Sequence, residues 1–135
     1  MQLAAMRNAN ISEDNYLRII EAKTAALFAA AAEVGGLLAG ASTTEVEALK
    51  SYGKNLGIAF QLIDDALDYG SVNSVLGKNT GDDFREGKVT LPVVLAYRRG
   101  DQTDRAFWER AMATQNSESP DFETTFASDV ELAVQ

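Results

Sequence analysis

A long helical pattern of apolar residues in the middle of the chain constrains the fold more than any other feature. Between Val46 and Leu67, apolar residues or glycine recur at alternating spacings of three and four, which places them on one face of a helix. Thr44 with Glu47 three residues later is the pattern of a reciprocal helix cap, and Gly70 suits the end of the same helix. We therefore predict one long helix whose core stripe comprises Val46, Leu49, Gly53, Leu56, Phe60, Ile63 and Leu67.

The rest of the chain also favours helices over strands. Apolar positions recur at helical spacing without sustained period-two alternation, and the chain contains only 10 Gly and 2 Pro. We predict helices over residues 12–38, 91–99 and 101–113, and an irregular charged loop over residues 71–89 that allows one helical turn at its start. The Ala-rich segment 25–32 would let another helix approach closely, which indicates an interior helix. The expected fold class is all-α.

Composition excludes several classes of function. The chain has 135 residues, which fits one domain, and its 12 Lys and Arg against 20 Asp and Glu give a net charge of −8, which repels nucleic acid and anionic membrane surfaces. Cysteine and histidine are absent, so disulfides, thiolate or histidine metal sites and Ser–His–Asp catalysis are excluded. No apolar run approaches the ~20 residues of a membrane span, and no signal pattern begins the chain. We expect a soluble, cytoplasmic protein whose metal ligands are oxygens.

Three carboxylates near the end of the predicted long helix are the clearest chemical signal. Asp64, Asp65 and Asp68 spell D-D-x-x-D, and Gln61, Asp64 and Asp68 share one stripe beside the apolar one. Like charges at this spacing destabilise a helix by roughly 0.2–0.5 kcal/mol per pair and oppose the dipole at the helix C-terminus. Mg²⁺ would offset this repulsion, because it binds one or two carboxylates together with water and phosphate oxygens. A solvated helix end is the alternative, and the motif alone does not decide between the two.

Three sequence segments resemble one family in the order in which that family has them. Residues 60–69 read F-Q-L-I-D-D-A-L-D-Y, residues 76–92 read L-G-K-N-T-G-D-D-F-R-E-G-K-V-T-L-P, and residues 16–28 read Y-L-R-I-I-E-A-K-T-A-A-L-F. Together they resemble the C-terminal half of a trans-isoprenyl (polyprenyl) diphosphate synthase, over roughly residues 1–113. The residues of these segments are most similar to those of the octaprenyl and decaprenyl type, which makes long ubiquinone side chains.

The resemblance implies an isoprenoid-synthase helical bundle and a Mg²⁺-dependent prenyl transfer. Members of the family ionise an allylic diphosphate, add the carbocation to isopentenyl diphosphate and release a proton, which lengthens the chain by one isoprene unit. By resemblance, Asp64 would bind Mg²⁺ directly, while Asp65 and Asp68 would support it from a second layer or through water. The bound ion would stabilise the charge that develops on the leaving diphosphate.

The resemblance also assigns roles to residues that chemistry alone would not single out. Lys23 and Lys78 match the lysines that hold the allylic diphosphate, and Lys88 matches a further basic residue in the loop that closes over the site. Thr24 and Gln61 match residues whose oxygens lie near the reacting carbons. Without the resemblance, Lys23 would be interpreted as a surface lysine with a buried stem, and the loop that also contains Asp82, Asp83 and Arg85 as a solvated segment.

The chain also departs from the family pattern. It contains no first aspartate-rich motif, and its beginning at residues 1–8 and its end after the capping signal at Ser128 both read as interrupted helices. We therefore expect residues 1–135 to be the C-terminal part of a bundle truncated at both ends and inactive alone. It should expose apolar surface over residues 25–32 and 56–63, and form a homodimer or associate with the missing N-terminal half.

Two other functions compete with this interpretation. A non-catalytic all-α subunit that pairs with a catalytic chain would be expected to lose its metal motif, whereas the D-D-x-x-D motif is intact. An acidic helical interaction module would use the stripe from Val46 to Leu67 for docking, and its ligand binding would not depend on Mg²⁺. Terpene cyclase-like chemistry typically shows an N/D-x-x-S/T-x-x-x-E motif, which this sequence lacks.

Overall fold

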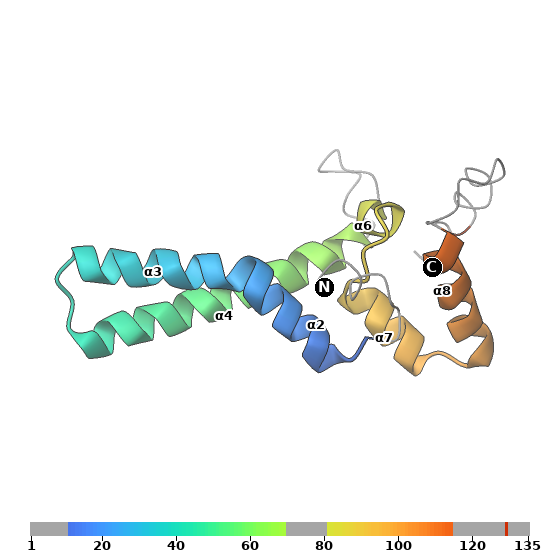
Figure 1. The fold of residues 1–135 in the computed structure, drawn as a ribbon, viewed down its shortest axis with the longest axis horizontal. Coiled ribbons are helices and arrows are strands. Elements are labelled where there is room, and N and C mark those ends of the chain that lie inside the picture. Colours follow the sequence, from blue (N-terminus) through green and yellow to red (C-terminus); the bar gives the residue numbers. More distant parts are fainter. Residues whose placement is uncertain (1–10, 70–80, 115–128, 130–135) are drawn as a thin grey trace. The chain divides into compact units, whose positions relative to one another are not determined.

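The computed structural model describes residues 11–69, 81–114 and 129, and every regular element among them is helical (Figure 1). The all-α prediction is therefore confirmed for the described residues. The chain divides into two compact units, one comprising Asp14–Asp64 and the other Asp65–Gln135 with Met1–Glu13. None of the helices within the described ranges is both long and apolar enough to span a bilayer.

The first unit is built on a helical hairpin. Its first arm runs without interruption through α2 (Glu13–Ile20), a π-helical turn η1 (Glu21–Ala25) and α3 (Ala26–Leu38). The second arm is α4 (Thr43–Asp68), which returns alongside α3 and continues into the second unit (Figure 1). The predicted helices over 12–38 and from Thr44 to Gly70 are confirmed, with ends shifted by one or two residues. The π-helical turn was not predicted.

The cap of α4 differs from the prediction. The reciprocal pair is Ser42 and Glu45: the Ser42 N–H and hydroxyl donate to Glu45 Oε2 at 2.8 and 2.7 Å, and the Glu45 N–H lies 3.4 Å from Ser42 Oγ. The predicted cap of Thr44 and Glu47 is wrong, because α4 begins at Thr43 and Thr44 already lies in the first turn. Two overlapping capping-box patterns occur in this segment, and the pattern alone does not say which one is used.

Small residues bring the two arms of the hairpin into close contact. A Cβ atom placed on Gly57 would lie 2.6 Å from Ala25 Cα, and one on Gly53 would lie 2.5 Å from the Phe28 carbonyl oxygen. The space that a side chain would need is therefore already filled by the backbone of the other arm. The predicted close approach of a second helix to the Ala-rich segment is confirmed.

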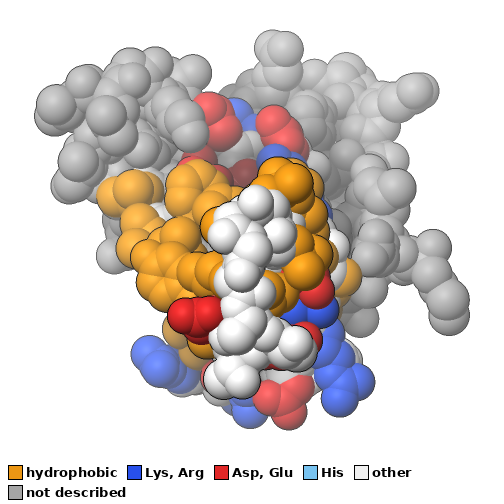
Figure 2. All heavy atoms as spheres, turned by 90° about the vertical axis from the view of Figure 1, so that its left-hand side faces the viewer, with side chains coloured by type: hydrophobic (Ala, Val, Ile, Leu, Met, Phe, Trp, Pro, Cys, Tyr) orange, Lys and Arg blue, Asp and Glu red, His pale blue; other side chains and the backbone are white. Residues whose placement is uncertain are grey.

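The predicted core stripe of α4 is buried only in part. Val46 is buried at 6% exposure, whereas the exposure of five other stripe residues ranges from 37% to 60%. Leu27 in the segment 25–32 is 74% exposed, so this chain does not by itself cover the helix that the sequence analysis interprets as interior. Each arm buries the side that faces the other, so the expected exposed apolar surface is present. On α3 and α4 it comprises Leu27, Val34, Leu37, Leu38, Leu49, Tyr52, Leu56, Phe60, Ile63 and Leu67, and Figure 2 shows apolar side chains gathered at the hairpin end.

Among its described residues, the second unit contains the further helices α6 (Asp82–Arg85), α7 (Leu91–Arg99) and α8 (Gln102–Thr114). The predictions of α7 and α8 are confirmed within one residue. The short helix α6 lies at the end of the predicted loop, whereas the helical turn that the sequence allowed was at its start, which lies outside the described residues. The core of this unit includes Phe84, Val93, Val94, Tyr97, Trp108, Ala111 and Met112, with the Phe84 and Trp108 rings 6.1 Å apart, edge to face.

Candidate functional site

The three carboxylates of D-D-x-x-D lie within the last two turns of α4, in different environments. Asp64 is exposed, Asp65 is buried at 3% exposure, and Asp68 is half-buried. Within the described ranges, no three acidic side chains converge closely enough to enclose a metal ion. The donor set is nevertheless of the kind that Mg²⁺ uses, because a Mg²⁺ site needs only one or two protein carboxylates.

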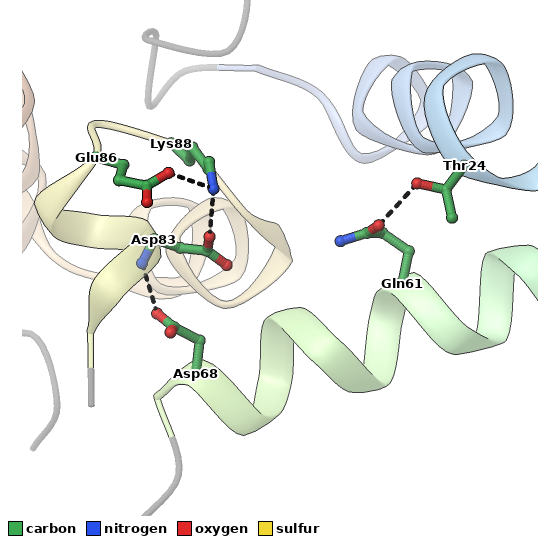
Figure 3. A network of polar contacts seen from close by, with 6 residues as sticks. All are labelled: Thr24, Gln61, Asp68, Asp83, Glu86 and Lys88. Carbon is green, nitrogen blue, oxygen red and sulfur yellow. Dashed lines mark hydrogen bonds and ion pairs between the residues drawn. The ribbon is translucent and has the colours of Figure 1, made fainter. Parts of the chain in front are cut away.

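Asp68 is held by the segment that begins α6. Its Oδ2 accepts the Asp83 N–H at 3.0 Å, and its carbonyl oxygen accepts the Gly81 N–H at 2.8 Å (Figure 3). Gly81 has a φ of +81°, a left-handed conformation that glycine adopts without strain. Burial raises the pKa of the Asp68 carboxyl, and the Asp83 N–H opposes that effect because it stabilises the charged form. The end of α4 is therefore tied to α6 by two hydrogen bonds.

Lys88 is held by two carboxylates of the same segment. Its ammonium lies 3.0 Å from Asp83 Oδ1 and 2.6 Å from Glu86 Oε2, as Figure 3 shows. The hydrogen bond to Glu86 is the largest of the effects that raise the pKa of Lys88, and Asp83 adds to it. Asp82 and Arg85 pair with each other at 3.1 Å at an exposed position. The four charged loop residues of the sequence analysis therefore have different roles, and only Asp83 and Lys88 belong to this network.

Thr24 and Gln61 are in direct contact within the first unit. The Thr24 hydroxyl donates to Gln61 Oε1 at 2.8 Å, which joins the two arms of the hairpin (Figure 3). Thr24 and the exposed Lys23 both lie in η1, where the Ala26 N–H reaches the Glu21 carbonyl oxygen five residues earlier. Single π-helical turns of this kind are frequent at functional sites. The structure thus brings together two residues that the resemblance placed near the same reacting carbons.

Lys78 and two buried hydroxyl groups complete the account of the residues around the site. Lys78, the second predicted diphosphate-binding lysine, lies outside the described residues. At the start of α7, Thr90 is buried at 5% exposure, and burial raises the pKa of the Tyr69 hydroxyl. The Thr90 hydroxyl opposes this effect on the pKa of Tyr69, although among the described residues neither hydroxyl makes a hydrogen bond of good geometry. The π-helical turn left no local signal in the sequence.

Known proteins are similar to this chain in both sequence and fold. An all-helical chain with D-D-x-x-D on one long helix and a Lys-Thr pair on another has the features of the isoprenoid synthases. The profile described as Polyprenyl synthetase matches residues 1–128, and the chain belongs to that family.

Curated relatives and solved structures agree with this assignment. The octaprenyl diphosphate synthase of Escherichia coli K12 is 51% identical over 100 residues, which are 74% of this chain and 31% of the relative. A decaprenyl diphosphate synthase from Rhodobacter capsulatus has a TM-score of 0.75 at 50% identity, covering 96% of this chain and 40% of that one. A polyprenyl synthase from Caulobacter crescentus, complexed with calcium and isoprenyl diphosphate, has a TM-score of 0.78 at 47% identity, covering 98% and 42%. The chain spans about a third of the length of the curated relatives that it matches.

Proposed function

We propose that this chain provides part of the diphosphate-binding site of a polyprenyl diphosphate synthase of the long-chain type. The reaction is the Mg²⁺-dependent condensation of an allylic diphosphate with isopentenyl diphosphate. The observation that supports it most is D-D-x-x-D at the end of α4 in a chain of the polyprenyl synthetase family. The Caulobacter relative, which was crystallised with a divalent cation and an isoprenyl diphosphate, supports the ligand class.

The carboxylates suit Mg²⁺ by their chemistry and exposure. Asp64 is exposed and is therefore the candidate for direct contact with the ion. Asp65 and Asp68 are less accessible and would act from a second layer or through water, with Asp68 already oriented by the Asp83 N–H. A bound Mg²⁺ would supply positive charge beside the leaving diphosphate. Calcium in the Caulobacter relative supports a divalent ion without deciding which one.

The remaining residues bind and orient the substrate in this proposal. Lys23, Lys78 and Lys88 would contribute positive charge to the allylic diphosphate in an otherwise acidic chain. The Thr24 hydroxyl donates its only proton to Gln61, so its oxygen lone pairs can face cationic charge on the reacting carbons. Thr24 and Gln61 therefore act as an oriented pair near the carbocation.

We further propose that this chain alone does not catalyse prenyl transfer. It contains no first aspartate-rich motif, and it spans about a third of its curated relatives. Association with the complementary N-terminal half or with a second copy is part of the proposal, and the exposed apolar side chains of α3 and α4 support it. The cytoplasmic location also stays a prediction.

A helical interaction module is the second candidate function. The exposed apolar residues on α4, such as Phe60 and Ile63 at 55% and 60% exposure, favour it. In that case the carboxylates would only keep the chain in solution, and Mg²⁺ would not change the binding of a diphosphate. The two functions therefore differ in one measurable property.

Calorimetric titration with an allylic diphosphate, with and without Mg²⁺, tests the proposal. We expect binding only with Mg²⁺ and its loss in Asp64→Asn, which removes one charge at nearly constant size. Asp14→Asn is the matched control, because Asp14 is also an exposed helical aspartate but lies outside the motif. An affinity for the diphosphate that does not depend on Mg²⁺, or that changes equally in both variants, would rule the proposal out.

A further inference from the structure

One residue contacts both a carboxylate of the aspartate motif and a predicted diphosphate-binding lysine. The Asp83 N–H donates to Asp68 Oδ2 at 3.0 Å, and its carboxylate pairs with Lys88 Nζ at 3.0 Å (Figure 3). We propose that Asp83 is a positioning residue that holds the Lys88 ammonium in place for the diphosphate. This inference rests on the proposed function, because it assumes that Lys88 binds the diphosphate.

The backbone around Asp83 is held firmly enough to position another side chain. The neighbouring Phe84 is fully buried and its ring contacts Trp108, which anchors α6 in the core of the second unit. The Lys88 N–H donates to the Asp83 carbonyl oxygen at 2.9 Å. Asp83 is thus joined to Lys88 by its backbone and its side chain, and to Asp68 by its N–H.

The two carboxylates around Lys88 are not equivalent. The Asp83 side chain is 18% exposed, whereas that of Glu86 is 61% exposed. The Glu86 contact is the shorter one and the largest cause of the raised pKa of Lys88, but an exposed ion pair restrains its partner weakly, because water competes with it and the side chain must be ordered. An ammonium has three N–H donors, and two of them face Asp83 and Glu86. Among the residues that the structure describes, no other partner engages the third donor, which can bind a phosphate oxygen while Asp83 keeps its contact.

If Asp83 positions Lys88, removing its charge should weaken diphosphate binding, whereas charge repulsion alone predicts stronger binding. A carboxylate near an anion repels it, so its removal should strengthen diphosphate binding if charge alone matters. If Asp83 orders Lys88, its removal should weaken binding, because the flexible lysine must then be ordered by the ligand itself. Glu86 has the same charge and the same lysine partner, which makes it the matched control.

The experiment measures the affinity of the full chain for inorganic diphosphate in Mg²⁺ by calorimetry. We expect Asp83→Ala to weaken binding by about tenfold, the lower end of the range for a hydrogen bond to a charged group. Asp83→Asn, which retains a neutral acceptor, should lie between it and the wild type. Glu86→Gln should leave the affinity unchanged or raise it, and far-UV circular dichroism would check that each variant is folded.

A double-substitution cycle distinguishes positioning through Lys88 from a general structural role. In a Lys88→Ala chain, the further substitution Asp83→Ala should cause no additional loss, because nothing remains to be positioned. Equal losses with and without Lys88, or tighter binding in Asp83→Ala, would overturn the inference. A wild-type chain that binds neither inorganic nor allylic diphosphate would instead overturn the proposed function on which the inference depends.

Discussion

The close contact between α4 and the first arm of the hairpin makes a specific prediction for Gly57→Ala. A Cβ at Gly57 would lie 2.6 Å from Ala25 Cα and 3.1 Å from Phe28 Cβ. The nearest atom is backbone, so the collision cannot be relieved by rotating a side chain. The two arms must separate, and the Thr24–Gln61 hydrogen bond of 2.8 Å lies close by, because Gln61 is one turn after Gly57 and Thr24 directly precedes Ala25.

The change in stability caused by Gly57→Ala follows from one stabilising and two destabilising contributions. Alanine stabilises a helix interior by about 1 kcal/mol relative to glycine. Overpacking costs about 1–3 kcal/mol, and loss of the Thr24–Gln61 hydrogen bond costs about 0.5–1.5 kcal/mol. The net expectation for Gly57→Ala is a loss of about 2 kcal/mol. Gly35→Ala in α3 is the matched control, because its Cβ would meet nothing within 4 Å, so we expect it to be stabilising.

Urea unfolding followed by circular dichroism at the helical band would measure both variants. The midpoint of Gly57→Ala should fall by on the order of 1 M, and that of Gly35→Ala should rise. If Gly57→Ala is as stable as the wild type, or moves with Gly35→Ala, the close packing between the arms is not as described. The same variant should weaken diphosphate binding, because the displaced segment η1 also carries Lys23.

Two further predictions concern Phe84 and the cap of α4. Phe84→Ala should destabilise the second unit by about 3–5 kcal/mol, because the ring is fully buried, and Trp108 fluorescence would detect the loss; an unchanged unfolding midpoint would contradict it. Ser42→Ala should cost about 1 kcal/mol in urea unfolding while Thr44→Ala costs little, and the reverse order would restore the cap predicted from sequence. The hydrogen bond from the Ser42 hydroxyl, and to a smaller extent that from its N–H, lowers the pKa of Glu45. The stabilisation from this capping pair is therefore fully present above the ordinary pKa of a glutamate, and it is lost as the pH falls through the lowered pKa of Glu45. The difference between wild type and Ser42→Ala should therefore shrink on acidification, whereas a pH-independent difference would count against the capping pair.

Local signals predicted most of the helices correctly. The bounds of α7 follow from Thr90 before Leu91 and Pro92, because proline suits the first turn of a helix. The long helix α4 follows from a periodic pattern over more than six turns. Where two capping patterns overlapped, at the start of α4, the prediction of Thr44 was wrong, because the structure uses Ser42. The π-helical turn at η1 also has no periodic signal of its own.

By itself, the sequence determined the helical class, the oxygen-only donor set and the D-D-x-x-D cluster, because these depend on residue types and on spacing along one helix. The other candidate residues came from the resemblance of three sequence segments to one family. Only the tertiary structure decided which candidates meet. The contact of Thr24 with Gln61 and the attachment of Asp68 and Lys88 to Asp83 join residues on different segments, and such contacts depend on how the segments pack. The same holds for burial. Periodicity places Val46 and Phe60 on one face of α4, but only the packing of the first arm against it decides that Val46 is covered and Phe60 is exposed.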